Sequence, residues 1–263
     1  MKNKKNIIKN FLNQGFSVVD CENPNKLELL KEKIYKLSIS LLQIKNLKPE
    51  LFFDNLHKNI NSKNLNEFKI SLIKKINNDK FFRNSYFAIS NEILELIVGN
   101  ELAMQKNLNL SIQLPKDSNS LLPLHADTWS GNSPFEVVIW IPLVDCYRTK
   151  SMFILPNSKY KKLFSKTKLK NISNSNQLYN HIKKDLKWIK VNYGQILIFN
   201  QSLPHGNITN KEKTTRWSFN CRFKSLFSPY GDKKLGEFFE IQSLKPASSV
   251  ALNYEFPEFK KNG

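Results

Sequence analysis

Residues 122–145 read LPLHADTWSGNSPFEVVIWIPLVD, and they join a short polar motif to the most apolar run of the chain. The run at 135–144 is rich in β-branched and aromatic residues and follows a Gly-Asn turn, which is typical of a buried strand. Ahead of it, His125 and Asp127 are two positions apart, so that both side chains project to the same side of an extended segment. The stretch predicts a buried strand with a candidate pair of metal ligands at its entrance, although a plain polar turn would also fit these residues.

Five more segments carry strand signals. Residues 107–115, NLNLSIQLP, alternate polar and apolar residues as a half-buried strand does. The others are 151–155, 187–191, 195–200 and 215–223. Proline, glycine and asparagine lie in the connections between them. Several short strands connected by turns indicate an antiparallel sandwich or barrel.

The first hundred residues carry mainly helical patterns. Residues 10–20 are expected to form a short strand after a turn, and Asn25 to cap a helix over 26–45. Pro49 ends that segment, and apolar periodicity resumes over 50–100. We expect one domain over 1–263. Its parts are a mainly helical support region (1–105), a β core (106–230) with a lysine-rich insert at 159–186, and an irregular C-terminal extension (231–263).

The chain is strongly basic, with 41 Lys and Arg against 22 Asp and Glu and a formal net charge of +19. Only four of these residues are arginines, and the lysines are scattered along the chain among many asparagines. Proteins that bind nucleic acids rely on arginine forks and aromatic platforms, and no such motif is present. We therefore interpret the charge as a solvated surface and expect no nucleic-acid partner, while an anionic substrate or surface stays open.

The cysteines and the apolar segments indicate in which cellular compartment the protein is expected. Cys21, Cys146 and Cys221 are widely spaced and form no CxxC pair, which indicates reduced, structural thiols. The N-terminal residues are basic but lack the apolar segment of a signal peptide, and no later stretch approaches the ~18 apolar residues of a membrane span. We expect a cytoplasmic protein without a membrane span.

A third metal ligand has three candidates, since His57, His181 and His205 are the remaining histidines. His57 lies in the helical half and His181 in the lysine-rich insert, where a surface or packing role is expected. His205 lies in GQILIFNQSLPHGN, at the mouth of a predicted buried strand. Two histidines and one carboxylate on strand ends form the facial triad that leaves three positions open on non-heme Fe(II). His125, Asp127 and His205 are therefore the candidate catalytic metal ligands.

A polar strand face follows the last candidate ligand. Arg216 stands eleven residues after His205 and begins the stretch RWSFNCRF. On a strand, Arg216, Ser218, Asn220 and Arg222 share one face, and the aromatic residues between them share the other. A 2-oxoglutarate co-substrate has a distal carboxylate that a guanidinium fork matches, so Arg216 is the candidate cation for it. For Ser218 and Arg222, an ordinary solvent-facing role stays open.

These residues together resemble a known pattern. His125-x-Asp127, His205 and Arg216-x-Ser218 resemble the HxD, H and RxS motifs of Fe(II)- and 2-oxoglutarate-dependent dioxygenases. A longer stretch of the sequence is similar to the phytanoyl-CoA hydroxylase superfamily; it runs from VVIWIPLVD through SMFILPNSKYKK to GQILIFNQSLPHGN. Residues 122–156 are more narrowly similar to the 2-oxoglutarate oxygenases of bacterial carbohydrate-biosynthesis clusters. Where hydroxylases of the broader superfamily often carry Glu-Asn-Gly, this chain has Thr149-Lys150-Ser151, which argues against a phytanoyl-CoA-like substrate.

The resemblance implies a mainly β fold with N-terminal helices, whose core is a double-stranded β-helix, the cupin-like jelly roll. It implies Fe(II) held by His125, Asp127 and His205, with Arg216 paired to the distal carboxylate of 2-oxoglutarate and Ser218 donating a hydrogen bond to it. The implied enzyme converts 2-oxoglutarate and O2 to succinate and CO2 while it oxidises a small molecule. Because related halogenases replace the carboxylate ligand with a small residue, Asp127 favours hydroxylation or another oxidation.

The substrate residues are expected in the turn after the first two ligands. Trp129, Ser130 and Asn132 offer an indole beside hydroxyl and amide groups, which suits the mixed surface of a sugar or sugar conjugate, and Arg222 is a fourth candidate. A turn rich in Ser, Gly and Asn needs no ligand to explain it. Two alternatives therefore stay open: the same chemistry on a lipid, acyl or other small molecule, and a non-enzymatic basic binding protein on a jelly-roll scaffold.

Overall fold

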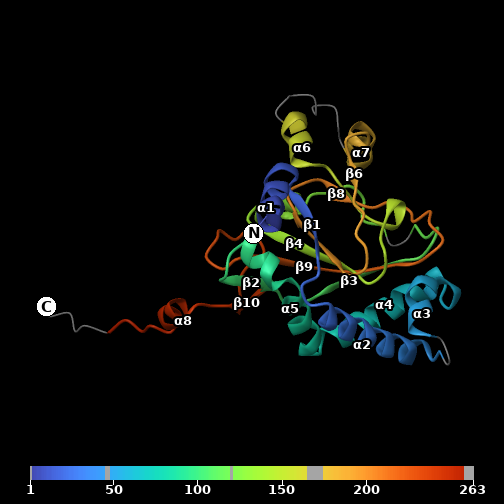
Figure 1. The fold of residues 1–263 in the computed structure, drawn as a ribbon, viewed down its shortest axis with the longest axis horizontal. Coiled ribbons are helices and arrows are strands. Elements are labelled where there is room, and N and C mark those ends of the chain that lie inside the picture. Colours follow the sequence, from blue (N-terminus) through green and yellow to red (C-terminus); the bar gives the residue numbers. More distant parts are fainter. Residues whose placement is uncertain (1, 45–47, 119–120, 165–173, 258–263) are drawn as a thin grey trace.

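The computed structural model describes residues 2–44, 48–118, 121–164 and 174–257, and its strands form two antiparallel sheets (Figure 1). The strands are β1 (Phe16–Asp20), β2 (Leu102–Gln105), β3 (Asn109–Gln113), β4 (Val137–Pro142), β5 (Phe153–Ile154), β6 (Lys187–Trp188), β7 (Gln195–Asn200), β8 (His205–Gly206), β9 (Arg216–Ser225) and β10 (Phe239–Ser243). The larger sheet has the order β1-β7-β4-β9-β2-β10, and β3 also pairs with β9. The smaller sheet has the order β6-β5-β8.

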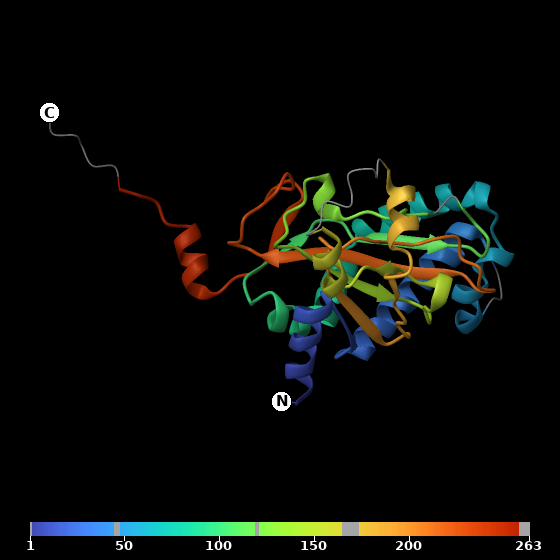
Figure 2. The same ribbon diagram turned by 90° about the horizontal axis from the view of Figure 1, so that it is seen from above.

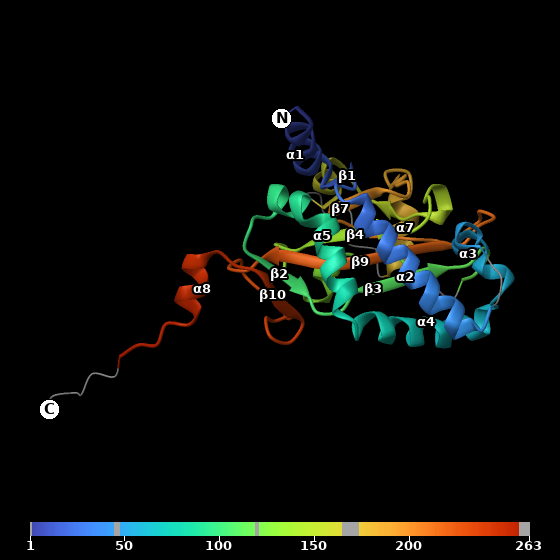
Figure 3. The same ribbon diagram turned by 60° about the horizontal axis from the view of Figure 1, so that its bottom comes forward.

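The helices lie outside the sheets, and several of them cross one face of the larger sheet (Figure 3). They are α1 (Lys2–Gln14), α2 (Pro24–Leu42), α3 (Pro49–Asn55), α4 (Ser62–Asn77), α5 (Lys80–Ile97), α6 (Asn157–Phe164), α7 (Ser175–Ile182) and α8 (Pro246–Leu252). Short 3-10 turns cover Leu56–Lys58, Asp127–Ser130 and Arg148–Lys150. The helices α2, α4 and α5 contact one another and pack with the sheet into one hydrophobic core.

Helix α2 shows how the sequence sets an element boundary. Its cap is Asn23, whose side chain accepts a hydrogen bond of 3.2 Å from the backbone N–H of Lys26. The expected cap, Asn25, is instead inside the helix. Pro24 explains the shift, because a proline at the first helical position has the required φ and needs no N–H there. Apolar residues at helical spacing, such as Leu27, then face the core.

Strand β9 has the two faces that the sequence predicts. Trp217 is fully buried, its ring lies 5.2 Å from that of Phe53, and its indole N–H donates to the Phe53 carbonyl at 3.0 Å. Farther along the same face, the ring of Phe223 stacks on Tyr86 of α5 at 6.4 Å. The helices therefore cover the apolar face of β9. The opposite face, which begins with Arg216, points toward the space between the two sheets.

Several elements differ from the sequence-based expectation. Residues 10–14, which were expected to form a turn before the first strand, belong to α1. The lysine-rich insert contains most of α6 and all of α7, and its residues 165–173 lie outside the described residues. Strand β2 lies in the region expected to be helical. The C-terminal extension contains β10 and α8, and α8 projects away from the body of the molecule (Figures 1 and 2). Within the described ranges, no helix is long and apolar enough to cross a membrane.

Candidate metal centre and co-substrate cavity

His125 and His205 are brought together by their backbones. The N–H of each residue donates to the carbonyl of the other, at 2.9 Å and 2.8 Å, and the two imidazole rings lie 4.3 Å apart between centroids. His205 belongs to β8, which is hydrogen-bonded to β5 in the smaller sheet. Two residues that are 80 positions apart in the sequence are thus adjacent in the fold.

Gly206 allows this close approach. A Cβ atom at this position would lie 2.7 Å from the carbonyl oxygen of Leu122 and 2.9 Å from that of Pro123. Such distances are shorter than side chains tolerate, so the segment that carries His125 can reach β8 only because a glycine follows His205. The His-Gly pair in the sequence is therefore explained by main-chain packing.

Both histidines present the same nitrogen to the space between them. Nδ1 of His125 lies 2.7 Å from the carbonyl oxygen of Pro123, and Nδ1 of His205 lies 2.8 Å from that of Leu203. A carbonyl oxygen only accepts, so Nδ1 is the donor in each ring, and in the neutral form with this tautomer Nε2 has the lone pair. Burial, followed by the neighbouring His125, lowers the pKa of His205 to about 4, which keeps this ring neutral near pH 7. Neutral imidazoles of this kind are metal ligands.

Asp127 completes a group of three donors. Its carboxylate is buried, and its Oδ1 lies 3.6 Å from Nε2 of His125. One ligand atom from each of His125, Asp127 and His205 lies within 4.8 Å of the other two. Among the described residues, no other three His, Cys, Asp or Glu side chains come together in this way. The other histidines lie elsewhere: His57 contacts Thr215, and His181 is exposed on α7. The structure therefore brings together the three residues that the sequence selects.

A cavity of about 430 Å³ opens beside these donors, between the two sheets. Its wall includes the three donors, Met152 and Gly206 from the smaller sheet and its connections, and Asn109, Trp140, Phe199, Arg216 and Arg222 from the larger sheet. This volume lies within the range of roughly 300–1,000 Å³ that is typical of small-molecule sites. The cavity therefore has room for a small molecule beside the donors.

Arg216 is a buried cation without a carboxylate partner. It is 2% exposed, and its guanidinium donates to Ser111 Oγ at 2.8 Å and to the Ser151 carbonyl at 3.5 Å. None of the ion pairs between described residues includes it. Its Nε and the hydroxyl of Ser218 are buried without a hydrogen-bond partner, and burial lowers the pKa of Arg216 to about 10. Buried charges are normally paired, so this wall of the cavity is suited to an anion.

The structure is similar to solved structures of non-heme enzymes. It matches a structure described as the non-heme monooxygenase ThoJ with nickel at a TM-score of 0.54 and 15% identity, covering 94% of this chain and 93% of that one. It matches HygX from Streptomyces hygroscopicus, with nickel and 2-oxoglutarate bound, at 0.51 and 12% identity, covering 88% and 90%. The epimerase SnoN, in complex with Fe3+, alpha ketoglutarate and nogalamycin RO, matches at 0.50 and 11%, covering 87% and 86%.

The fold is a double-stranded β-helix. The matches extend over nearly the whole length of both chains, which confirms the jelly-roll core with N-terminal helices expected from the sequence. At the level of sequence, no family model and no curated protein matches the chain. The likeness of this double-stranded β-helix to known proteins is therefore one of fold.

The sequence-based substrate candidates lie in different places. Trp129 is 48% exposed, and Ser130 is also exposed. Asn132 is buried, and its amide nitrogen donates to Oε2 of Glu136 at 3.4 Å. None of these three residues lines the cavity. Arg222 does line it, but its guanidinium contacts Asp127 Oδ2 at 2.8 Å. The turn after the first ligands therefore packs against the protein or faces outward, and does not form the cavity wall.

Lys69 lines the cavity and was not singled out from the sequence. Burial and then the charge of Arg216 lower the pKa of its ammonium. A signal was present, because Lys69 interrupts the apolar stripe of α4, four residues after Leu65 and three before Leu72, both of which are buried. A lysine within the buried stripe of a helix is a candidate for a site inside the fold. With Arg216 it gives this part of the cavity two positive charges.

Proposed function

We propose that the chain is an Fe(II)- and 2-oxoglutarate-dependent oxygenase. One observation supports this best: a two-histidine, one-carboxylate donor set and an unpaired buried arginine line the same cavity. The donor set is the one that non-heme Fe(II) oxygenases use, and the arginine matches the distal carboxylate of a co-substrate that chelates such a metal. The solved structures with this fold that are described with nickel or iron and 2-oxoglutarate are consistent with the proposal.

The three donors fit a single divalent ion. His125 and His205 each offer Nε2 from a ring that is fixed by a hydrogen bond from Nδ1 to a backbone carbonyl, and Asp127 offers one carboxylate oxygen. These contacts hold the donors in position before any ion binds. Bound Fe(II) with 2-oxoglutarate would supply the oxidising chemistry with O2, and the protein supplies binding, orientation and exclusion of water.

The other residues of the cavity have separate tasks in this proposal. Arg216 binds the distal carboxylate of 2-oxoglutarate through its free N–H groups. Ser218 is fully buried two residues farther along β9 and is not among the residues that line the cavity, and its unpartnered hydroxyl is the proposed second donor to this carboxylate. Lys69 adds a second positive charge beside the guanidinium. The apolar side chains of Trp140 and Phe199 exclude water from the space in front of the donors.

We further propose that the reaction is hydroxylation of a carbohydrate or carbohydrate-linked intermediate. The cavity wall combines aromatic rings with the amides of Asn109, Asn207 and Asn220, and this combination suits a polyhydroxylated molecule with apolar ring faces. A lipid or acyl substrate would require a more continuous apolar wall than the one that Lys69 and these amides interrupt. A panel of sugar nucleotides, free sugars and acyl thioesters tests this, since only a true substrate raises succinate formation in proportion to its own consumption.

Anaerobic titration with Fe(II) and 2-oxoglutarate tests the oxygenase itself. The chelate is expected to give a weak visible charge-transfer band, and succinate should form once O2 is admitted. His205→Ala should abolish the band and succinate formation, whereas His181→Ala, which removes an exposed histidine on α7, should leave both unchanged. Absence of the band and of succinate in the wild-type protein would exclude the proposed function and favour a non-enzymatic binding protein.

A further inference from the structure

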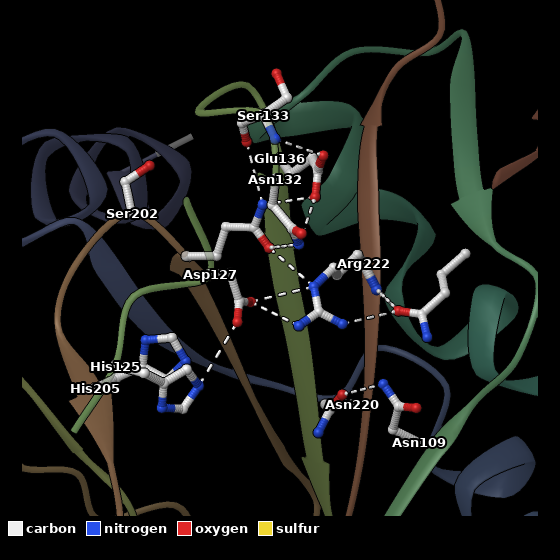
Figure 4. A network of polar contacts seen from close by, with 12 residues as sticks. Asn109, His125, Asp127, Asn132, Ser133, Glu136, Ser202, His205, Asn220 and Arg222 are labelled. Atoms are coloured by element: carbon white, nitrogen blue, oxygen red, sulfur yellow. Dashed lines mark hydrogen bonds and ion pairs between the residues drawn. The ribbon is translucent and has the colours of Figure 1, made fainter. Parts of the chain in front are cut away.

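The guanidinium of Arg222 is hydrogen-bonded to buried polar side chains, among them Asp127 (Figure 4). Its Nε and one terminal nitrogen donate to the same oxygen, Oδ2 of Asp127, at 3.1 Å and 2.8 Å. Nε also donates to Oε1 of Gln201 at 3.0 Å, and the other terminal nitrogen donates to Oε1 of Gln105 at 3.2 Å. The side chain is thus fixed on three sides, and a substrate-binding role would require breaking these contacts.

The two oxygens of Asp127 have different surroundings as a result. Oδ2 receives both hydrogen bonds from Arg222, whereas Oδ1 lies 3.6 Å from Nε2 of His125 and faces the two imidazoles (Figure 4). A carboxylate oxygen with two charged donors has little lone-pair density left for a metal ion. The geometry therefore selects Oδ1 as the ligand atom.

Gln201 holds the other parts of this arrangement together. Its backbone carbonyl accepts from the N–H of Asp127 at 3.0 Å, and its side-chain carbonyl accepts from Arg222. Its amide nitrogen donates to Oε2 of Glu136 at 2.6 Å and to the carbonyl of Ser133 at 3.1 Å. Glu136 is in turn held by the N–H of Ser133 at 2.9 Å. The fully buried Gln201 thus fixes the main chain of Asp127 directly and its side chain through Arg222.

We infer that Arg222 is a positioning residue that makes Asp127 a one-oxygen ligand, and that Gln201 and Glu136 hold Arg222 in place. The inference rests on the proposed function. A carboxylate that binds through both oxygens would occupy one more coordination position. The facial triad requires three open positions, two for the chelating co-substrate and one for O2. Arg222 keeps them open by occupying Oδ2.

The test is metal binding without turnover. Isothermal titration of the wild-type protein with Ni(II), and with 2-oxoglutarate at saturating Ni(II), gives two affinities. Arg222→Met removes both hydrogen bonds to Oδ2, and we expect the Ni(II) affinity to fall roughly 10- to 100-fold, as is typical when a partner of a metal ligand is lost. Arg222→Lys can still donate one hydrogen bond to Oδ2 and should recover part of this loss. In a crystal structure of Arg222→Met with Ni(II), both oxygens of Asp127 should lie within bonding distance of the ion.

A matched control separates positioning from stability. Lys150 is also buried, and its ammonium lies 2.7 Å from Oδ1 of Asp54, outside the metal centre. Lys150→Met removes a buried cation of the same kind and should lower the melting temperature without changing the Ni(II) affinity. Equal losses of Ni(II) affinity in the Lys150 and Arg222 variants would overturn the inference, as would wild-type affinity in a folded Arg222→Met protein.

A second variant covers the case in which Arg222→Met does not fold. Gln201→Met leaves Arg222 in the chain but removes the group that anchors it, and it should weaken Ni(II) binding by a smaller factor than the loss of Arg222 itself. Unchanged Ni(II) affinity in Gln201→Met would then overturn the inference. If the wild-type protein binds neither Ni(II) nor 2-oxoglutarate, the proposed function fails. If the wild type binds both and the variants bind Ni(II) equally well, only the role of Arg222 fails.

Discussion

Replacing Arg216 by methionine should separate co-substrate binding from stability. The guanidinium has five N–H donors, and its contacts to Ser111 and Ser151 use two of them. Two of the remaining donors can bind the distal carboxylate of 2-oxoglutarate. Hydrogen bonds to charged groups contribute about 1.5–3 kcal/mol each, and the desolvation of the carboxylate offsets part of the sum. We therefore expect Arg216→Met to lose about 3 kcal/mol of binding free energy, or roughly 100-fold in affinity.

The same substitution should not destabilise the protein without co-substrate. An unpaired buried charge is unfavourable in the empty cavity, because desolvation penalises it and no carboxylate compensates. The melting temperature of Arg216→Met should therefore equal or exceed that of the wild type. Arg83→Met is the control, because Arg83 donates to the backbone carbonyls of Met104 and Lys106, away from the cavity. This variant should lose stability and keep the affinity for 2-oxoglutarate.

Calorimetry with Ni(II) and 2-oxoglutarate and thermal denaturation check both expectations on the same samples. Arg216→Lys keeps the positive charge but not the planar fork, and an intermediate affinity is expected for it. A folded Arg216→Met protein that binds 2-oxoglutarate within about threefold of the wild type would refute the reasoning, since 1.4 kcal/mol already corresponds to tenfold. A large loss of stability in the same variant would show that the buried guanidinium is a structural group.

Three further predictions concern the rest of the fold. Cys146 and Cys221 have thiol pKa values raised to about 12 by burial, so at pH 8 a disulfide reagent should modify neither of them in the native protein. After denaturation the same reagent should modify all three cysteines, including the partly buried Cys21. Gly206→Ala should weaken Ni(II) binding and lower the unfolding free energy by about 1–3 kcal/mol in urea denaturation, because the new Cβ meets backbone carbonyls. Trp217→Ala should lower it by about 3–5 kcal/mol, whereas Trp129→Ala, at a half-exposed position, should change it by less than about 0.5 kcal/mol. Equal effects of the two tryptophan substitutions would contradict the assignment of the core.

The strands that carry the candidate site could be predicted from two patterns, the alternation of polar and apolar residues in β9 and the apolar runs of β4 and β7. In β9, the residues from Arg216 to Phe223 switch faces at every position, so the sequence alone separates the cavity side from the helix side. The donor set could be predicted because His125 and Asp127 have the spacing of a strand and His205 follows another apolar segment. The fold class follows from several such short strands with turn residues between them.

Other parts of the structure had no periodic signal. Strand β2 has four residues and β8 has only two, so both are too short to show an alternation or an apolar run. Yet β2 carries Gln105, which contacts Arg222, and the residue after β7 is Gln201. Glutamine in a loop or a short strand is ordinarily exposed, and only the fold shows that these two are buried around a guanidinium. The arrangement around Asp127 therefore depends on chain segments whose pairing is set by tertiary contacts.

The reciprocal backbone bridge between His125 and His205 has a consequence for how this protein could change. The separation of the two imidazoles is set by peptide groups and by one glycine, and not by the side chains that surround the cavity. Residues such as Asn109 and Met152 can therefore be exchanged without altering the spacing of the donors. Such a scaffold favours divergence and directed evolution, because substitutions in the wall of the cavity can change the substrate specificity while the donor geometry stays the same.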